Sequence, residues 1–478
     1  MDFKSKKIRD HREPKKHTNK DHAHHVTIGL GVGIIVLLLF GIFMLIKSLD
    51  FSNIIFSFGK NLRTDNEGHT NILLAGTGGE GHDGGDLTDT IIVASIDYNN
   101  KLVSMLSIPR DLYVKSTKLD AGERINQIYY LGKHKFNSKA GMEDLKDIAS
   151  GISGMQIDYY AKVDFDGFVK IVNSLGGIDL NVEKDIYDPY YPLGETTRYQ
   201  TFSIKAGYQH LDGETALKFA RSRKTTSDFD RARRQQQLLN AVKEKALSLN
   251  ILTDPGKIQA LYNSLQNSIE TNFTVEEIIE LAKTAKDFGK ESLISNVLSD
   301  NPYQCGGFLY TPAREFFGGA FVLLPAGKNY ESVHEMTDMI FHHAPVVKAE
   351  PAIQILNGTK TGNLAGEVKE YLNRLCFNIV YTGNASTKDV TSTKIYYQPG
   401  VKGEKPAILE LVKKYLPYPE VPGIPAEYLD SEKKTGTQIV VELGSDYLQN
   451  RLKDPFDILP YINAPKTTTQ EATSQSQQ

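Results

Sequence analysis

The stretch 71–111, NILLAGTGGEGHDGGDLTDTIIVASIDYNNKLVSMLSIPRD, decides the fold. It contains three apolar runs, at 71–74, 89–97 and 102–108, and a glycine-rich loop at 76–89 separates the first run from the second. A short Asn-containing turn joins the last two runs, which predicts an antiparallel hairpin. The runs are continuously apolar rather than alternating, so we expect strands that are covered on both faces.

The sequence from 141 to 345 continues this pattern with alternating helices and strands. Helical spacing and glycine stops predict helices at 141–150, 165–175, 213–222 and 229–249, and extended segments at 159–164 and 178–182. The part from 250 to 345 mixes helices, as at 275–286, with loops, and no linker-like composition divides it from what precedes. We therefore predict one α/β domain over residues 70–345.

A second, smaller α/β domain is predicted over residues 352–443. Strand-like segments (353–356, 378–382, 394–397) alternate there with helical ones (364–375, 407–415). The tail 464–478 is rich in Thr, Ser and Gln and is predicted to be disordered.

Residues 26–46 form an uncharged apolar run of 21 residues. As a helix it would span about 30 Å, the thickness of a bilayer's hydrocarbon core. A cleaved signal peptide is the alternative, but its apolar core would be only about 7–15 residues long. We predict a single-pass anchor with a connector at 47–69. The basic tail 1–25 places the N-terminus in the cytoplasm and the bulk of the chain outside the cell membrane.

Composition excludes several classes of protein. The chain of 478 residues is 40% hydrophobic and 24% charged, which argues against a wholly disordered chain and against a polytopic membrane protein. Residues 1–25 hold eight Lys/Arg and four acidic residues, so the remainder is acidic on balance and has no broad field for nucleic acid. Two cysteines, Cys305 and Cys376, lie in different predicted domains, and we expect free thiols.

Arginines gather at the predicted ends of elements. Pro109 ends a strand, so Arg110 and Asp111 lie at the mouth of the sheet, either as a structural ion pair or as ligand contacts. A second group comprises Arg221, Arg223, Asp228, Arg231, Arg234 and Gln235. In a helix that begins near residue 228, Arg231, Arg234 or Gln235, Leu238 and Val242 would share one stripe.

Buried guanidinium groups need an anionic partner, because leaving them unpaired costs several kcal/mol, roughly. Internal carboxylates such as Asp89 or Asp228 are one such partner. A phosphate or pyrophosphate is the other, favoured by the forked geometry of Arg and by a helix N-terminus. The spacing leaves both readings open.

The loop 76–89 holds potential oxygen ligands at Glu80, Asp83, Asp86 and Asp89, beside His82. Hard oxygen ligands near a polyphosphate suit magnesium, although a glycine-rich loop is otherwise a flexible connector. No Walker motif, Gly-x-Ser-x-Gly elbow, His-Glu-x-x-His motif or dinucleotide fingerprint in its proper context is present.

At these residues the chain resembles the LytR-CpsA-Psr family of bacterial cell-envelope proteins, and 352–443 is similar to the LytR C-terminal domain. The matching stretches are Asn71–Leu74, Thr88–Thr90, Ser107–Asp111, Arg124–Asn126, Leu175–Ile178, Leu211–Gly213, Ala216–Arg223 and Asp228–Gln236. The resemblance implies an α/β/α fold with a mixed central sheet around a polyprenyl pyrophosphate. It also implies transfer of a lipid-linked glycopolymer to peptidoglycan, with release of polyprenyl phosphate.

Residue by residue, the resemblance implies that the pyrophosphate lies on Arg110, Arg221, Arg223, Arg231, Arg234 and Gln235. It implies magnesium on Asp89, with Asp111 or Asp228 orienting these groups. Two positions depart from the family pattern, because Gly78 stands where an Asp is usual and Leu87 where an Arg is common. Metal binding would then draw on neighbours such as Asp83 and Asp86. A non-catalytic pyrophosphate-binding scaffold and a transcriptional regulator remain as alternatives to the enzyme.

Overall fold

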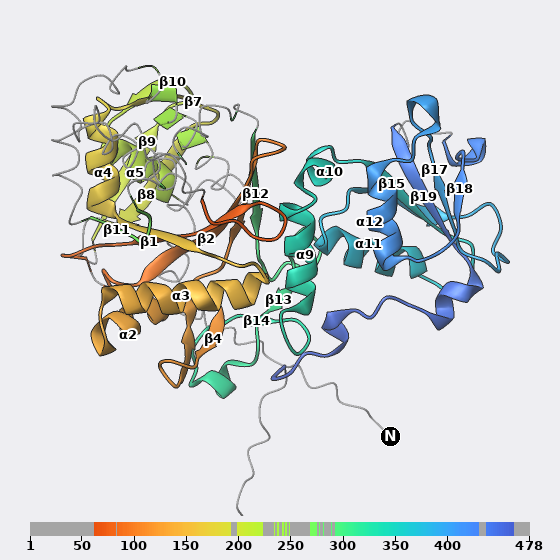
Figure 1. Ribbon diagram of the computed structural model, residues 1–478, viewed down its shortest axis with the longest axis horizontal. Coiled ribbons are helices and arrows are strands. Elements are labelled where there is room, and N and C mark those ends of the chain that lie inside the picture. Colours follow the sequence, from red (N-terminus) through yellow and green to blue (C-terminus); the bar gives the residue numbers. More distant parts are fainter. Residues whose placement is uncertain are drawn as a thin grey trace, which may run out of the picture.

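The computed structural model describes residues 62–82, 84–192, 198–222, 292–429 and 436–462, with single positions and short stretches between 234 and 288. These residues form two α/β parts, which lie on either side of helix α9 (Glu331–Phe341) in Figure 1. The predicted anchor 26–46 and the tail 464–478 lie outside the described residues. Within the described part, no helix has the length and apolarity needed to cross a bilayer.

The first part is built on a mixed six-stranded sheet with the order β11-β6-β1-β2-β3-β12. Its strands are β1 (Thr70–Thr77), β2 (Thr88–Asp97), β3 (Leu102–Ser107), β6 (Tyr159–Asp164), β11 (Ile269–Thr271) and β12 (Leu293–Val297). β2 pairs antiparallel with both β1 and β3, which confirms the predicted hairpin. β6 runs parallel to β1 and β12 runs parallel to β3, so the sheet is mixed.

Helices cover both faces of this sheet, and every residue of β1 is buried. Ile72 and Leu74 pack into a cluster with residues of α4 (Phe165–Ser174) and α5 (Gly213–Arg221). Leu73 packs on the opposite face with residues of α2 (Ile125–Lys135) and α3 (Ser138–Ser153). The continuous apolar runs therefore mark a sheet between two helical layers, as predicted.

Several elements differ from the sequence-based expectation. Helix α3 is longer than the predicted 141–150, because Asn137 caps it by accepting from the Ala140 N–H at 2.9 Å. Helix α2 was not predicted. Small antiparallel pairs surround the main sheet: β4 (Tyr113–Ser116) with β5 (Ala121–Arg124), β7 (Ile178–Val182) with β10 (Gly207–Leu211), β8 (Ile186–Pro192) with β9 (Tyr199–Ile204), and β13 (Leu309–Tyr310) with β14 (Leu324–Pro325). Most of the predicted helices 229–249 and 275–286 lies outside the described residues.

The second part is a five-stranded sheet with the order β16-β15-β19-β17-β18. Its elements are β15 (Ala352–Asn357), α11 (Leu364–Arg374), β16 (Ile379–Asn384), β17 (Lys394–Tyr397), α12 (Ala407–Tyr415), β18 (Glu420–Pro422) and β19 (Thr437–Leu443). The predicted strands and helices correspond to five of these within two residues at each end. The central strand β19 was not predicted. Helix α10 (Ala344–Lys348) precedes this sheet.

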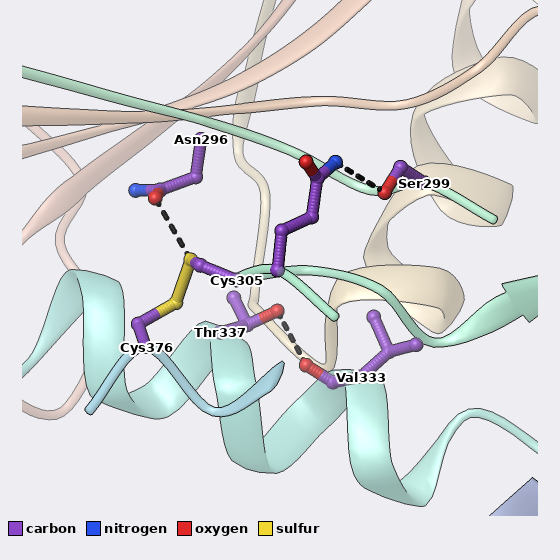
Figure 2. Close-up of a disulfide and its surroundings, with 7 residues drawn as sticks. Asn296, Ser299, Cys305, Val333, Thr337 and Cys376 are labelled. Carbon is purple, nitrogen blue, oxygen red and sulfur yellow. Dashed lines mark hydrogen bonds between the residues drawn. A yellow bond between two sulfur atoms is a disulfide. The ribbon is translucent and has the colours of Figure 1, made fainter. Parts of the chain in front are cut away.

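The expectation of free cysteines is wrong, because Cys305 and Cys376 form a disulfide with a Cα–Cα distance of 4.5 Å (Figure 2). The bond joins the loop before β13 to the residue after Leu375 at the end of α11. The two parts also share one hydrophobic cluster, in which the Phe308 and Tyr371 ring centroids lie 6.5 Å apart. The expectation failed because the spacing of two cysteines in sequence carries no information about which segments the fold brings together.

Candidate functional site

The sheet gathers the ends of several strands along one edge. Thr77, the last residue of β1, pairs with Thr88 at the start of β2 and with Asp164 at the end of β6. β3 runs toward the same edge, and its final residue Ser107 pairs with Ile92, the fifth residue of β2. Carboxyl edges of strands in α/β sheets are common ligand sites, because helix N-termini and loops meet there.

Arg110 and two predicted aspartates come together at this edge. The Arg110 Nη1 donates to Asp89 Oδ1 at 3.0 Å, and its Nε lies 3.6 Å from Asp111 Oδ2. Arg124 Nη1 lies 3.4 Å from the other Asp111 oxygen, and Asn126 donates to Asp89 Oδ1 at 3.4 Å. The Arg110 side chain is only 13% exposed, so removing it would leave two carboxylates of this network undercompensated.

Asp164 lies beside the glycine-rich loop where β6 passes into α4. Its carboxylate caps α4 by accepting from the Gly167 N–H at 2.8 Å, and burial raises the pKa of this carboxyl. A Cβ on Gly79, which has φ +89°, would come 2.9 Å from the Asp164 Cβ. Glycine at 79 therefore allows the loop to lie directly against Asp164. The His82 ring meets the Phe165 ring edge-on, with centroids 5.4 Å apart.

Arg221 reaches the same region from the last turn of α5. Its guanidinium carbon lies 4.4 Å from the Phe165 ring centroid and 5.6 Å from that of Tyr191. Its Nε is buried and has no hydrogen-bond partner among the described residues. Burial raises the pKa of Tyr191, and the Arg221 charge opposes that shift. A buried guanidinium N–H without an acceptor is an available donor for an anion.

Arg234 lies on a buried stripe with Leu238 and Val242, which agrees with the predicted helical spacing. Its Nε donates to the Phe219 carbonyl at 3.2 Å and its Nη2 to the Ser222 carbonyl at 2.7 Å. These carbonyls belong to the C-terminal turn of α5, where intrahelical donors run out. In this structure Arg234 therefore holds the end of α5, the helix that carries Arg221.

The remaining predicted site residues lie outside the described residues. They are Asp83 in the loop and Arg223, Asp228, Arg231 and Gln235.

The loop carboxylates that are described do not gather around one point. Asp86 has Lys133 Nζ at 2.7 Å from each of its oxygens, and His134 lies 3.7 Å away. Asp89 directs Oδ1 to Arg110 and Asn126, whereas its Oδ2 has no partner among the described residues. Magnesium in phosphate sites is often held by one or two carboxylates plus substrate phosphates. Asp89 Oδ2 fits that arrangement, and Asp86 does not.

Sequence reasoning missed Asp164, Phe165, Tyr191 and Asn126 as neighbours of the site. Asp164 and Phe165 had a signal, because a strand that passes directly into a helix at the carboxyl edge places its last residues there. Tyr191 had none, since its position depends on how the β8–β9 hairpin packs on α5.

Comparison with known proteins identifies the family. The model of the LytR_cpsA_psr family matches residues 48–315, more than half of the chain, and the model described as LytR cell envelope-related transcriptional attenuator matches 350–447. The chain belongs to the LytR_cpsA_psr family.

Among curated relatives, the polyisoprenyl-teichoic acid–peptidoglycan teichoic acid transferase TagV of Bacillus subtilis is 33% identical over 210 residues. That match covers 43% of this chain and 50% of TagV. The transferase TagU of Bacillus cereus strain AH820 is 29% identical over 241 residues, which cover 50% of this chain and 72% of TagU. The chain thus spans half the length of TagV. The crystal structure of B. subtilis TagV aligns with a TM-score of 0.42 and 27% identity, covering 56% of this chain and 96% of that one.

Proposed function

We propose that this protein is a transferase that moves a glycopolymer from a polyprenyl-pyrophosphate carrier to peptidoglycan during cell wall assembly. Family membership and the activity named for TagV and TagU support the reaction class. The observation that carries the proposal is the buried Nε of Arg221, which lies over Phe165 and has no hydrogen-bond partner in the part of the chain that the structure describes. Arg110 lies at the same edge of the sheet. A pyrophosphate would supply the acceptor that this Nε lacks among the described residues.

In the proposed reaction, a hydroxyl oxygen of peptidoglycan attacks the phosphorus that bears the glycopolymer. A new phosphodiester P–O bond forms, the bridging P–O bond breaks, and polyprenyl phosphate leaves while the hydroxyl proton is released. Phosphoryl transfer needs mainly positioning and neutralisation of charge. Arg110 and Arg221 would bind the pyrophosphate oxygens, and Asp111 would orient Arg110 through its 3.6 Å contact. The sequence also predicts four further pyrophosphate-binding residues, Arg223, Arg231, Arg234 and Gln235, and an orienting role for Asp228.

We also propose that the protein uses magnesium and that Asp89 Oδ2 would hold the ion together with substrate phosphates. Asp83 remains a predicted second ligand, whereas Asp86 would first have to leave Lys133. When bound, the ion would neutralise negative charge on the pyrophosphate. Chelation of divalent ions is expected to slow transfer, and magnesium should restore it.

We also propose that residues 26–46 anchor the chain in the cell membrane and that the described part lies outside it. The apolar run and the basic tail support this orientation. The Cys305–Cys376 disulfide supports it independently, because such bonds persist in oxidising compartments.

The test uses the full chain in detergent with a polyprenyl-pyrophosphate-linked glycopolymer and a peptidoglycan oligomer, and it measures released polyprenyl phosphate. Arg110→Ala and Arg221→Ala should each slow release about 10²–10³-fold, the usual effect of removing a charge-stabilising donor. Arg451→Ala is the matched control, since Arg451 is 43% exposed in the second part and pairs with Glu367 at 3.5 Å. Lipid binding without release in the parent protein would favour the scaffold. Full activity in both site variants would remove these arginines from the site.

A further inference from the structure

Away from the candidate site, three metal-ligating side chains converge where the chain enters the first part. Asp65 lies just before β1, His69 directly precedes its first residue, and His342 follows the last residue of α9. Each residue offers one ligand atom, and these atoms all lie within 4.8 Å of one another. Among the described residues, Asp65, His69 and His342 are the set of His, Cys, Asp or Glu side chains close enough together to hold one metal ion.

Asp65 holds its carboxylate in place through the local backbone. Oδ1 accepts from the His69 N–H at 2.9 Å and from the Glu67 N–H at 3.0 Å. Oδ2 accepts from Asn71 Nδ2 at 2.8 Å and faces His342 Nε2 at 3.6 Å. In tetrahedral zinc sites, two ligand atoms at their usual bond lengths lie about 3.4 Å apart. The 3.6 Å separation therefore matches two ligands of one ion.

The His342 ring is oriented like that of a metal ligand, with one nitrogen on a carboxylate and the other directed toward the cluster. Its Nδ1 lies 2.9 Å from Asp338 Oδ1, a carboxylate that would hold the proton on that nitrogen. Its Nε2 is buried and has no hydrogen-bond partner among the described residues, the Asp65 Oδ2 lying 3.6 Å away. Metal-bound histidines characteristically direct the other ring nitrogen to a carboxylate, which fixes the tautomer and leaves the free nitrogen for the ion.

His69 has an oxygen atom near each of its ring nitrogens. The Ser95 hydroxyl lies 3.3 Å from Nδ1, and the Asp97 carboxylate lies 3.7 Å from Nε2. If Nε2 binds the ion, the Ser95 hydroxyl lies within hydrogen-bond distance of Nδ1 and can accept its proton. The residue is 5% exposed, and its ring lies 5.3 Å from that of His342 between centroids.

We propose that Asp65, His69 and His342 bind a divalent metal ion of the zinc class. Two imidazoles and one carboxylate form a common zinc ligand set, with the fourth position left to water. The ion would join the start of β1 to the end of α9, two segments more than 270 residues apart in sequence. It would hold the segment before β1 against the end of α9. Helix α10 follows there and leads to the second part. This site is separate from Asp89 and the proposed transferase chemistry.

The test measures Zn²⁺ binding to the full chain in detergent at pH 8, by calorimetry and by thermal unfolding with and without the ion. The tail histidines His11, His17, His22, His24 and His25 are replaced by Gln in every sample, because they offer zinc other ligands. The parent should bind one equivalent and melt at a higher temperature with zinc.

Three variants and one control locate the site. Asp65→Asn and His342→Gln, which alter opposite sides of the cluster, should weaken binding at least 100-fold and abolish the thermal shift. Asp338→Asn should weaken it about 10–100-fold, the usual effect of losing the group that orients a ligand. His334→Gln should bind like the parent, since His334 lies on α9 but its Nε2 contacts the Gly151 carbonyl at 2.8 Å, away from the cluster.

Melting without zinc shows whether each variant is folded. The absence of stoichiometric zinc in the parent would overturn the proposal. So would parental affinity in either folded ligand variant, whatever the transferase assay gives.

Discussion

Removing the Cys305–Cys376 disulfide should cost the protein stability through its unfolded state. The bond closes a loop with a sequence separation of 71 residues. For a loop of that length, the chain-entropy model gives about 4 kcal/mol of stabilisation, as an upper bound because the unfolded chain retains some structure. We expect the contacts around the bond to remain after its removal, since they include bonds that do not involve the cysteines, such as that from Arg374 Nη1 to the Pro302 carbonyl at 3.2 Å.

The assay is urea unfolding of the full chain in detergent, comparing the parent with the Cys305→Ala/Cys376→Ala double variant. The chain has no Trp and 24 Tyr, so far-ultraviolet circular dichroism and tyrosine fluorescence are the suitable probes. The variant should unfold at lower urea, with a steeper dependence on urea because its unfolded chain exposes more surface. Parent protein treated with reductant should coincide with the variant. Equal midpoints for oxidised parent and variant would refute the reasoning.

Three further substitutions test the framework of the candidate site. Burial raises the pKa of the Asp164 carboxyl above its ordinary 3.8. Ionising this carboxyl is therefore harder in the folded state than in the unfolded state, so the free energy of unfolding falls as pH rises from 3.8 through the raised pKa. Asp164→Asn keeps the helix cap, so it should melt above the parent at pH 7 and with it at pH 3. Asp212→Ala removes the cap of α5 and should cost about 1 kcal/mol in urea unfolding, whereas Asp212→Asn should not. Gly213→Ala brings a Cβ to 2.4 Å from the Val169 carbonyl and should cost about 1–3 kcal/mol, against no comparable strain in Gly151→Ala, where nothing lies within 4 Å.

The central strands could be predicted because burial on both faces leaves a direct record in the sequence. β1, β2 and β3 are continuous apolar runs, and the short turn after β2 predicted its antiparallel pairing with β3. Helix α2 left a weaker record. Its N-cap residue Arg124 makes no side-chain capping bond, and Gly132 lies within its last turns. A Cβ on Gly132 would meet the Gly141 Cα at 2.6 Å, so this glycine serves the close packing of α2 on α3. That reason is tertiary, and a local pattern does not contain it.

In the candidate site, too, the features set by local sequence were predictable and those set by tertiary packing were not. Pro109 marked the strand end correctly, so the position of Arg110 at the sheet edge was predictable from sequence. Its partners were not, because internal carboxylates and a phosphate satisfy the same guanidinium. Arg234 illustrates the limit further. Its buried place on the stripe followed from helical spacing, but its bonds to α5 carbonyls depend on how two helices meet.

The charges around Arg110 bear on how a pyrophosphate donor would be neutralised. Arg110 and Arg124 face Asp89 and Asp111, so these four described side chains together carry no net charge. Adding an anion to a balanced, largely buried network is unfavourable unless another cation accompanies it. Arg221 is such a cation, since its Nε has no acceptor among the described residues. A magnesium ion on Asp89 Oδ2 would be a second such cation. It would take over part of the neutralisation of Asp89 and so leave more of the Arg110 charge for the donor. Arg221→Ala should therefore make transfer more dependent on magnesium, whereas Arg451→Ala should leave that dependence unchanged. Equal magnesium dependence in Arg221→Ala and the parent would mean that the two cations do not share the neutralisation of the donor.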